Sequence, residues 1–331
     1  MKYPNRLNLA NLPTPLTPLE KFTVPNFYGK IWVKRDELTG TEVSGNKIRK
    51  LEFTIAHALD KGCDTLITCG GVQSNHCRAT AILGARLGIK VHLILRGEKP
   101  EHPDGNLLMD YLVGAEISYL PELEWGSHVD LAHELLQQYQ QQGSNAHFIP
   151  TGASDEIGLW GYIAASEELK NDFETNGISP NYIVTATGSG GTQGGLVVGA
   201  KLFDLSGQVV GFNVCDNAEY FDNKIREDVA CWKHRYNMKL NEDDLEICTI
   251  EGYVGPGYGT ADQEVFKTIA ELARTEGLFL DPVYTGKAFH GMVTEVQKGV
   301  EGQLPGASNL VFVHTGGLFG VFPQQQNFRF D

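Results

Sequence analysis

The sequence contains no long apolar run and no cluster of basic residues. No stretch of about 18 apolar residues occurs, and the first residues, Met1–Asn5, open no hydrophobic signal segment. Lysine and arginine total 27 against 41 acidic residues, a formal charge of −14. A nucleic-acid partner and membrane contact are therefore not expected, and we expect a cytoplasmic location.

Cysteine is sparse, and its spacing excludes the usual frameworks. The six cysteines form no C-x-x-C pair, which argues against a disulfide scaffold or a redox motif. His76 stands beside Cys77, but no further ligands follow at a usual spacing, so no metal site is predicted. We expect reduced residues that mostly lie in the core, namely Cys63, Cys69, Cys77, Cys215, Cys231 and Cys248.

Short β-rich runs alternate with helical patterns over most of the 331 residues. This alternation predicts an α/β fold with parallel sheets, helices on both faces, and ligand sites at the carboxyl ends of strands. The length suits two lobes. The predicted strands are 31–35, 65–69, 91–95, 116–120, 147–149, 182–186, 209–215 and 310–314, and the predicted helices are 48–59, 74–87, 129–141, 159–173, 192–203 and 262–274.

Three segments lack a clear pattern. Asp104–Trp125 and Phe221–Glu246 are the least regular parts of the chain, and Gln324–Asp331 is typical of a polar tail.

Lys47 stands at the mouth of the predicted helix 48–59. Apolar residues repeat every three or four positions along this helix and form one face, Ile48, Leu51, Ile55 and Leu59. Ser44-Gly45-Asn46 just before it offers capping side chains and backbone freedom. Most lysines are solvated, and this chain has several others, such as Lys34, Lys50 and Lys287.

A glycine-rich loop, Thr187–Gly195, joins strand 182–186 to an apolar helix. Glycines there let backbone N–H groups turn inward, and the amino end of the helix adds partial positive charge, which together favour a phosphate cradle. Gln193 breaks the dinucleotide fingerprint, and no Gly-Lys-Ser/Thr follows as in a P-loop. A tight turn with close helix packing is the structural alternative.

Four further turns combine glycine with hydroxyl or aromatic side chains. In Gly70–His76, Ser74 can cap the following helix, or meet a substrate carboxylate, and the two roles are compatible. The others are Gly255–Gly259, Asp281–Lys287 and Val313–Gly317. A tyrosine in such a turn is more often packed than catalytic, so only the combination of turns indicates a ligand site.

Taken together, these motifs resemble the 1-aminocyclopropane-1-carboxylate (ACC) deaminase and D-cysteine desulfhydrase family, which belongs to the tryptophan-synthase-β-like pyridoxal phosphate enzymes. The resemblance runs from Leu12 to Gly317. It rests on Ser44–Glu52, Gln73–His76, the 187–195 loop, Asp281–Tyr284 and His314–Gly317. It implies two open, twisted, mainly parallel sheets with pyridoxal phosphate between two domains. Residues 1–47 and 161–331 would form a large cofactor-binding domain and residues 48–160 a small one, and the family suggests a homodimer.

The resemblance also implies roles for matching residues. Lys47 would bind pyridoxal phosphate as a Schiff base and then act as the base at the substrate Cα. Lys50 would approach the cofactor phosphate and Asn75 its phenolic oxygen, while Ser74 would meet the substrate carboxylate. Tyr258 and Tyr284 would lie beside the cofactor ring and the substrate. The phosphate would be cradled by Gly188, Ser189, Gly190, Gly191 and Thr192.

Two positions favour one branch of the family. At the position of Thr285, ACC deaminases tend to have glutamate, and at the position of Thr315 they tend to have leucine. Both threonines resemble the desulfhydrase branch instead. A hydroxyl near the pyridine nitrogen gives a weaker electron sink than a carboxylate, which suits elimination of sulfide, a good leaving group. The expected reaction converts D-cysteine to pyruvate, hydrogen sulfide and ammonia. The alternatives are ACC deaminase, a serine or diaminopropionate lyase, and a catalytically idle ligand-binding protein of the same fold.

Overall fold

Two β-sheets organise the chain, and its computed structural model describes residues 1–330. In both sheets every strand pair is parallel except β1–β2. The larger sheet has the order β1 (Leu16–Pro18), β2 (Lys30–Lys34), β10 (Asn309–Val313), β7 (Tyr182–Thr187), β8 (Gln208–Asn213) and β9 (Cys248–Ile250). The smaller sheet has the order β5 (Glu116–Leu120), β4 (Lys90–Arg96), β3 (Thr65–Gly71) and β6 (Ala146–Ile149). The predicted α/β architecture is confirmed.

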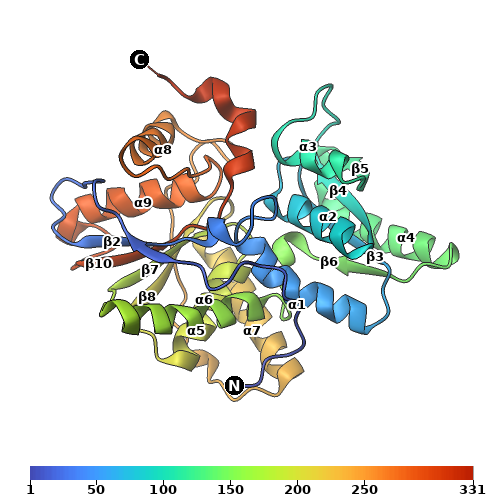
Figure 1. The fold of residues 1–331 in the computed structure, drawn as a ribbon, viewed down its shortest axis with the longest axis horizontal. Coiled ribbons are helices and arrows are strands. Elements are labelled where there is room, and N and C mark those ends of the chain that lie inside the picture. Colours follow the sequence, from blue (N-terminus) through green and yellow to red (C-terminus); the bar gives the residue numbers. More distant parts are fainter. Residues whose placement is uncertain (331) are drawn as a thin grey trace.

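Helices cover both faces of each sheet (Figure 1). The larger sheet lies between α8 (Gln263–Glu276) with α9 (Thr285–Gln297) and α5 (Leu159–Asn176), α6 (Gly191–Phe203) and α7 (Ala218–Tyr236). The smaller sheet carries α2 (Asn75–Leu87), α3 (Gly105–Leu112) and α4 (His128–Gln141). Between the sheets runs α1 (Asn46–Asp60), which packs against α5 and α2. The 3-10 turns are η1 (Asp36–Leu38), η2 (Glu122–Ser127), η3 (Thr151–Ala153), η4 (Glu242–Asp244), η5 (Gly299–Glu301), η6 (Leu318–Gly320) and η7 (Phe322–Asn327).

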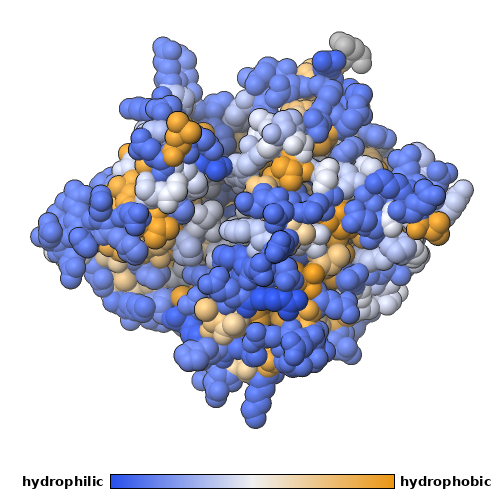
Figure 2. All heavy atoms as spheres, turned by 180° about the vertical axis from the view of Figure 1, so that it is seen from behind, coloured by the Kyte–Doolittle hydropathy of each residue, from blue (hydrophilic) through white to orange (hydrophobic). Residues whose placement is uncertain are grey.

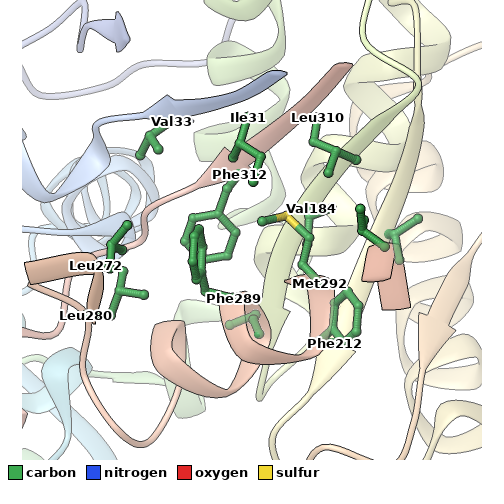
Figure 3. Packing of buried hydrophobic residues seen from close by; sticks show 14 of the residues in the cluster. Ile31, Val33, Val184, Phe212, Leu272, Leu280, Phe289, Met292, Leu310 and Phe312 are labelled. Atoms are coloured by element: carbon green, nitrogen blue, oxygen red, sulfur yellow. The ribbon is translucent and has the colours of Figure 1, made fainter. Parts of the chain in front are cut away.

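The core of the larger sheet is aromatic and aliphatic (Figure 3). Phe289 and Met292 of α9 are fully buried against the strands, and the Phe289 ring meets the Phe312 ring of β10 edge-on at 5.1 Å between centroids. Strands covered on both faces are expected to be rich in Val, Ile and Phe, as these are. Figure 2 shows that the face on the reverse of Figure 1 is mostly hydrophilic, with scattered apolar patches. The rigid core fixes the carboxyl ends of the strands, where the site forms.

Three helices were missed by the sequence-based prediction. Helix α3 lies in the segment 104–125, and α7 occupies much of 221–246, both predicted as irregular. In α7 a single apolar stripe is buried among charged neighbours, Phe221, Ile225, Val229 and Trp232. Helix α9 begins at Thr285, inside a segment interpreted only as a turn. The tail prediction was also wrong in part, because η7 covers 322–327; Asp331 lies outside the described residues.

Several further expectations can be compared with the structure. All six cysteines are free thiols, but only Cys63, Cys69 and Cys77 are buried, and Cys231 is exposed. Within residues 1–330, no helix is long and apolar enough to cross a membrane. The four strands of the smaller sheet lie between residues 65 and 149. The boundaries of the two proposed domains stay a prediction.

Three lysines grouped with the solvated ones are in fact buried. Lys34 pairs with Glu168 and Asp172 at 2.5 and 2.6 Å. Lys50 and Lys287 are 0% and 1% exposed to solvent. The burial of charged groups is costly unless they find partners, so each of these lysines marks a specific polar site.

Candidate active site

Lys47 lies in the first turn of α1, at the floor of a cavity of about 430 Å³. The turn before it depends on glycine rather than on side-chain capping. Gly45 has φ of 107°, and a Cβ there would lie 2.5 Å from the carbonyl oxygen of Thr315. The N–H of Asn46 donates to that same carbonyl at 3.1 Å. The predicted side-chain cap is therefore wrong. The start of the helix is held instead by a backbone hydrogen bond to the turn that follows β10.

The Lys47 amine is electrostatically unusual. Its pKa is lowered to about 8, because burial outweighs the opposing effect of the Asp281 carboxylate and the Arg78 charge also lowers it. Its Nζ lies 6.0 Å from the centroid of the Tyr284 ring. Among residues 1–330 no hydrogen-bond or ion-pair partner occupies this amine. A neutral, unoccupied amine is a competent nucleophile and base near neutral pH.

The glycine-rich loop after β7 leads directly into α6. Gly190 has φ of 81°, and α6 begins at the next residue. Within the described chain, no group accepts a hydrogen bond from the backbone N–H of Gly190, Thr192 or Gln193, and these donors lie at the amino end of α6. Such free donors at a helix start bind phosphate.

Ser154 ties two cationic side chains to this cradle. Its hydroxyl accepts from Lys50 Nζ at 3.2 Å and from the N–H of Gly191 at 3.2 Å, and meets the Ser189 hydroxyl at 2.8 Å. Lys224 donates to its carbonyl at 3.3 Å. Ser154 was missed by the sequence reasoning, although it ends a Thr-Gly-Ala-Ser turn directly after β6. Lys50 itself is buried behind Ser154 and does not line the cavity.

The corner at the start of α2 is suited to a carboxylate. Ser74 is the N-cap of α2, and its hydroxyl accepts from the N–H of Cys77 at 3.2 Å. Nothing in the described chain accepts from the N–H of Asn75 or of His76. A Cβ on Gly70 would lie 2.6 Å from the Ser74 hydroxyl, so only glycine leaves this hydroxyl in place. The cap is thus real, and two free donors remain beside it.

Tyr258 and Tyr284 form another wall of the same cavity. The hydroxyls of Tyr258 and Tyr284 hydrogen-bond to each other, and their rings stand at 74°. Asp281, also on the cavity wall, accepts from the N–H groups of Val283, Tyr284 and Thr285 at 2.9 Å and from the Thr285 hydroxyl at 2.7 Å. This carboxylate holds the start of α9 and with it Tyr284.

The structure brings most of the predicted residues to one cavity and leaves three outside it. Thr285 is fully buried, and its hydroxyl is used by Asp281, so it reaches the cavity only through that carboxylate. Lys50 reaches it only through Ser154. Gly191 stands behind the cradle against Ser154. The residues that do line the cavity are Lys47, Ser74, Asn75, Gly188, Ser189, Gly190, Thr192, Tyr258, Tyr284 and Thr315. Sequence reasoning missed Asn46, Arg96, Trp125, His128, Ser154 and Lys224.

The donor set fits pyridoxal phosphate. A free lysine amine, a helix-start anion cradle and an aromatic side wall share one cavity, which are the groups that its aldehyde, phosphate and ring require. The profile described as "Pyridoxal-phosphate dependent enzyme" matches residues 7–316. The chain belongs to this family. The predicted cofactor and family resemblance are thereby confirmed.

Within the pyridoxal-phosphate dependent family, the chain is similar to proteins of two named activities. It is 40% identical to the "Putative 1-aminocyclopropane-1-carboxylate deaminase" of Thermotoga maritima, over 97% of this chain and 99% of that protein. It is 37% identical to the mitochondrial "Bifunctional D-cysteine desulfhydrase/1-aminocyclopropane-1-carboxylate deaminase" of Arabidopsis thaliana, over 95% of this chain and 79% of that protein. A crystal structure titled as an ACC deaminase homologue superposes with a TM-score of 0.86 at 32% identity, covering 97% of this chain and 94% of that one.

Proposed function

We propose that this chain is a lyase that eliminates hydrogen sulfide from D-cysteine and yields pyruvate and ammonia. The observation that carries the proposal is the neutral hydroxyl of Thr315 on the cavity wall. Thr315 lines the cavity, and no partner for its hydroxyl is found among residues 1–330. Thr285 lies behind Asp281, to which its hydroxyl is committed, and adds no carboxylate of its own. A neutral partner for the cofactor ring suits a substrate whose leaving group departs easily.

Four groups of residues would share the work. When bound, pyridoxal phosphate supplies the sink for the electrons of the broken Cα–H bond. Lys47 would anchor it, and the free N–H groups of the 188–192 loop would hold its phosphate. Asn75 would face its phenolic oxygen. Ser74 and the N–H groups of Asn75 and His76 would orient the substrate carboxylate.

Proton transfer falls to Lys47 and the tyrosine pair. With a pKa of about 8, the Lys47 amine is substantially neutral at slightly alkaline pH and can take the Cα proton. Tyr258 and Tyr284 cover the cavity beside it and exclude water from the reacting atoms. The Cβ–S bond then breaks with its electron pair on sulfur, and the enamine product is hydrolysed by water to pyruvate and ammonia.

The first test uses Lys47→Ala beside a matched control, Lys61→Ala, an exposed lysine just beyond the far end of α1. We expect Lys47→Ala to lose pyruvate release from D-cysteine by more than about a hundredfold, and to lose the visible absorbance of lysine-bound cofactor. Lys61→Ala should keep both. If absorbance and turnover both survived in Lys47→Ala, the assignment would be wrong.

ACC deaminase activity is the second candidate, because relatives at 37% and 40% identity carry that name. Product release is measured side by side on D-cysteine, L-cysteine, β-chloroalanine, serine and ACC. Pyruvate and sulfide from D-cysteine at a higher kcat/KM than 2-oxobutanoate from ACC supports the proposal. The reverse order replaces it with the deaminase.

A further inference from the structure

A second cavity of about 390 Å³ adjoins the first, and the two share one wall. The residues that line both are Gly71, Arg96 and Tyr258. Gly71 contributes only backbone, so the side chains of Arg96 and Tyr258 separate the two spaces. We call these two side chains the partition. The far side of the second cavity is formed by Val72, Gln73, Glu122, Gly259, Val283, Gly320, Pro323 and Gln324.

The partition is a stack built from both sides of the molecule. Arg96 ends β4 of the smaller sheet, and its guanidinium lies 4.8 Å from the centroid of the Tyr258 ring, which follows β9 of the larger sheet. On the smaller-sheet side it also lies 5.4 Å from the Trp125 ring, and Trp125 stacks on His128 with centroids 4.5 Å apart. A guanidinium held between two aromatic faces is favourably placed and rigid.

The loop that carries Tyr258 is held in place by its glycines and by Lys287 of α9. Gly255 and Gly259 have φ of 69° and 83°, so the loop needs glycine at both positions. The buried Lys287 amine donates to the carbonyls of Val254 and Gly257 at 2.6 and 2.9 Å. Rotation of the Tyr258 side chain away from Arg96 would break its bond to Tyr284, and movement of the whole loop would break the Lys287 contacts.

The partition is a wall of the first cavity that is separate from the groups assigned to the substrate carboxylate, the base and the phosphate. The carboxylate corner is at Ser74, the base is Lys47, and the phosphate cradle lies at the start of α6. Beside Lys47 stands Tyr284, whose hydroxyl meets that of Tyr258. A Cβ substituent that extends along this tyrosine pair would meet the partition.

We propose that the Arg96–Tyr258 partition limits the size of the group on the substrate Cβ, and that the second cavity takes the thioether substituent of S-substituted cysteines once the partition is opened. The inference rests on the proposed function. The bond chemistry is unchanged: the Cβ–S bond breaks, its electron pair goes to sulfur, and a thiolate leaves and is protonated. No oxidant or reductant is needed.

The experiment compares S-benzyl-D-cysteine with D-cysteine in holoenzyme carrying Arg96→Ala. The ratio of their dissociation constants is read from the cofactor absorbance, and the ratio of kcat/KM from pyruvate, a product common to both. We expect Arg96→Ala to shift both ratios toward the benzyl compound by on the order of tenfold or more, because an apolar group gains a cavity. Arg96→Lys, whose long side chain still reaches the Tyr258 face, should shift them less.

The matched control is Arg226→Ala. Arg226 is an arginine of α7 that is 41% exposed, pairs with Asp222 and lines neither cavity, so its replacement leaves the stack in place and should leave both ratios at the wild-type value. If Arg96→Ala is poorly folded by thermal unfolding, Arg96→Gln takes its place with the same expected direction. Unchanged ratios in a folded Arg96 variant would overturn the partition.

The two proposals fail in different ways. A wild-type holoenzyme that releases no pyruvate from D-cysteine contradicts the proposed function. The partition is contradicted only by an unchanged ratio of dissociation constants, which is measured whether or not turnover follows.

Discussion

At the scale of single residues, the site depends on how burial changes ordinary side chains. Lys47 has a common side chain, yet its position in the first turn of α1 deprives it of solvent and lowers its pKa to about 8. The carboxylate of Asp281 lines the same cavity and opposes this lowering of the Lys47 pKa. The sequence motif singles out Lys47, and the fold adds the opposing charges of Arg78 and Asp281, which no local pattern indicates.

The balance predicts the pH dependence of cofactor loading. A lysine must be neutral to attack an aldehyde, so the rate at which apoprotein gains the absorbance of bound pyridoxal phosphate should rise with pH and level off above about 8. Asp281→Asn removes the opposing charge and should move the midpoint to lower pH. A midpoint of this pH dependence near the ordinary lysine pKa of about 10.4 would contradict the role of burial.

At the scale of elements, the regular strands and helices were predictable because apolar periodicity and turn residues agree with each other. Helix α9 was not, since its first turn, Thr285-Gly286-Lys287, has the composition of a loop. It becomes helical because Asp281 satisfies the N–H groups of residues 283–285, a tertiary contact that no local pattern announces. Ser154 escaped notice for a similar reason, since its partners Lys50 and Gly191 are distant in the sequence.

The same helix gives an element-scale prediction. Lys287→Met keeps the length of the buried side chain but leaves the carbonyls of Val254 and Gly257 without their donor. We expect a loss of about 1–3 kcal/mol in the free energy of unfolding, and faster amide hydrogen exchange in the loop 254–259. Urea unfolding and exchange followed by mass spectrometry measure these.

The control for that loop is Lys298→Met, at the other end of α9, where the side chain is 48% exposed and pairs with Glu295. Its effect on unfolding should stay within about 1 kcal/mol, and exchange in the loop should be unchanged. Equal losses in both variants would mean that Lys287 does not anchor the loop.

At the scale of the whole molecule, a buried ion network joins the helix that carries Lys47 to the larger sheet. Arg49 of α1 donates to Asp36 Oδ1 at 2.7 Å and to Glu168 of α5 at 3.1 Å, and Lys34 of β2 meets Glu168 at 2.5 Å. Burial opposes the ionisation of Asp36 and Glu168, but the Arg49 and Lys34 charges outweigh it and hold both pKa values below the ordinary range. The network fixes α1 between the sheets, and with it the cavity floor.

This network predicts how stability responds to pH. Because the folded pKa values of Asp36 and Glu168 are depressed, their contribution is complete above the ordinary values of about 4 and is lost as the pH falls through the folded values. Arg49→Met leaves Asp36 buried without its main partner and should cost about 3–5 kcal/mol near neutral pH. The deficit relative to wild type should shrink as the pH falls below about 4.

The matched control is Arg86→Met, which breaks the half-exposed pair with Glu42 and should cost no more than about 1 kcal/mol at any pH. Denaturant unfolding of the three proteins across a pH series measures all of these differences. A deficit in Arg49→Met that stays constant down to acid pH would show that lost side-chain packing, rather than the unpaired Asp36 charge, causes the destabilisation. A deficit that closes in acid instead locates the cost in the charge, so the ion network, and not apolar contact alone, holds α1 and Lys47 between the two sheets.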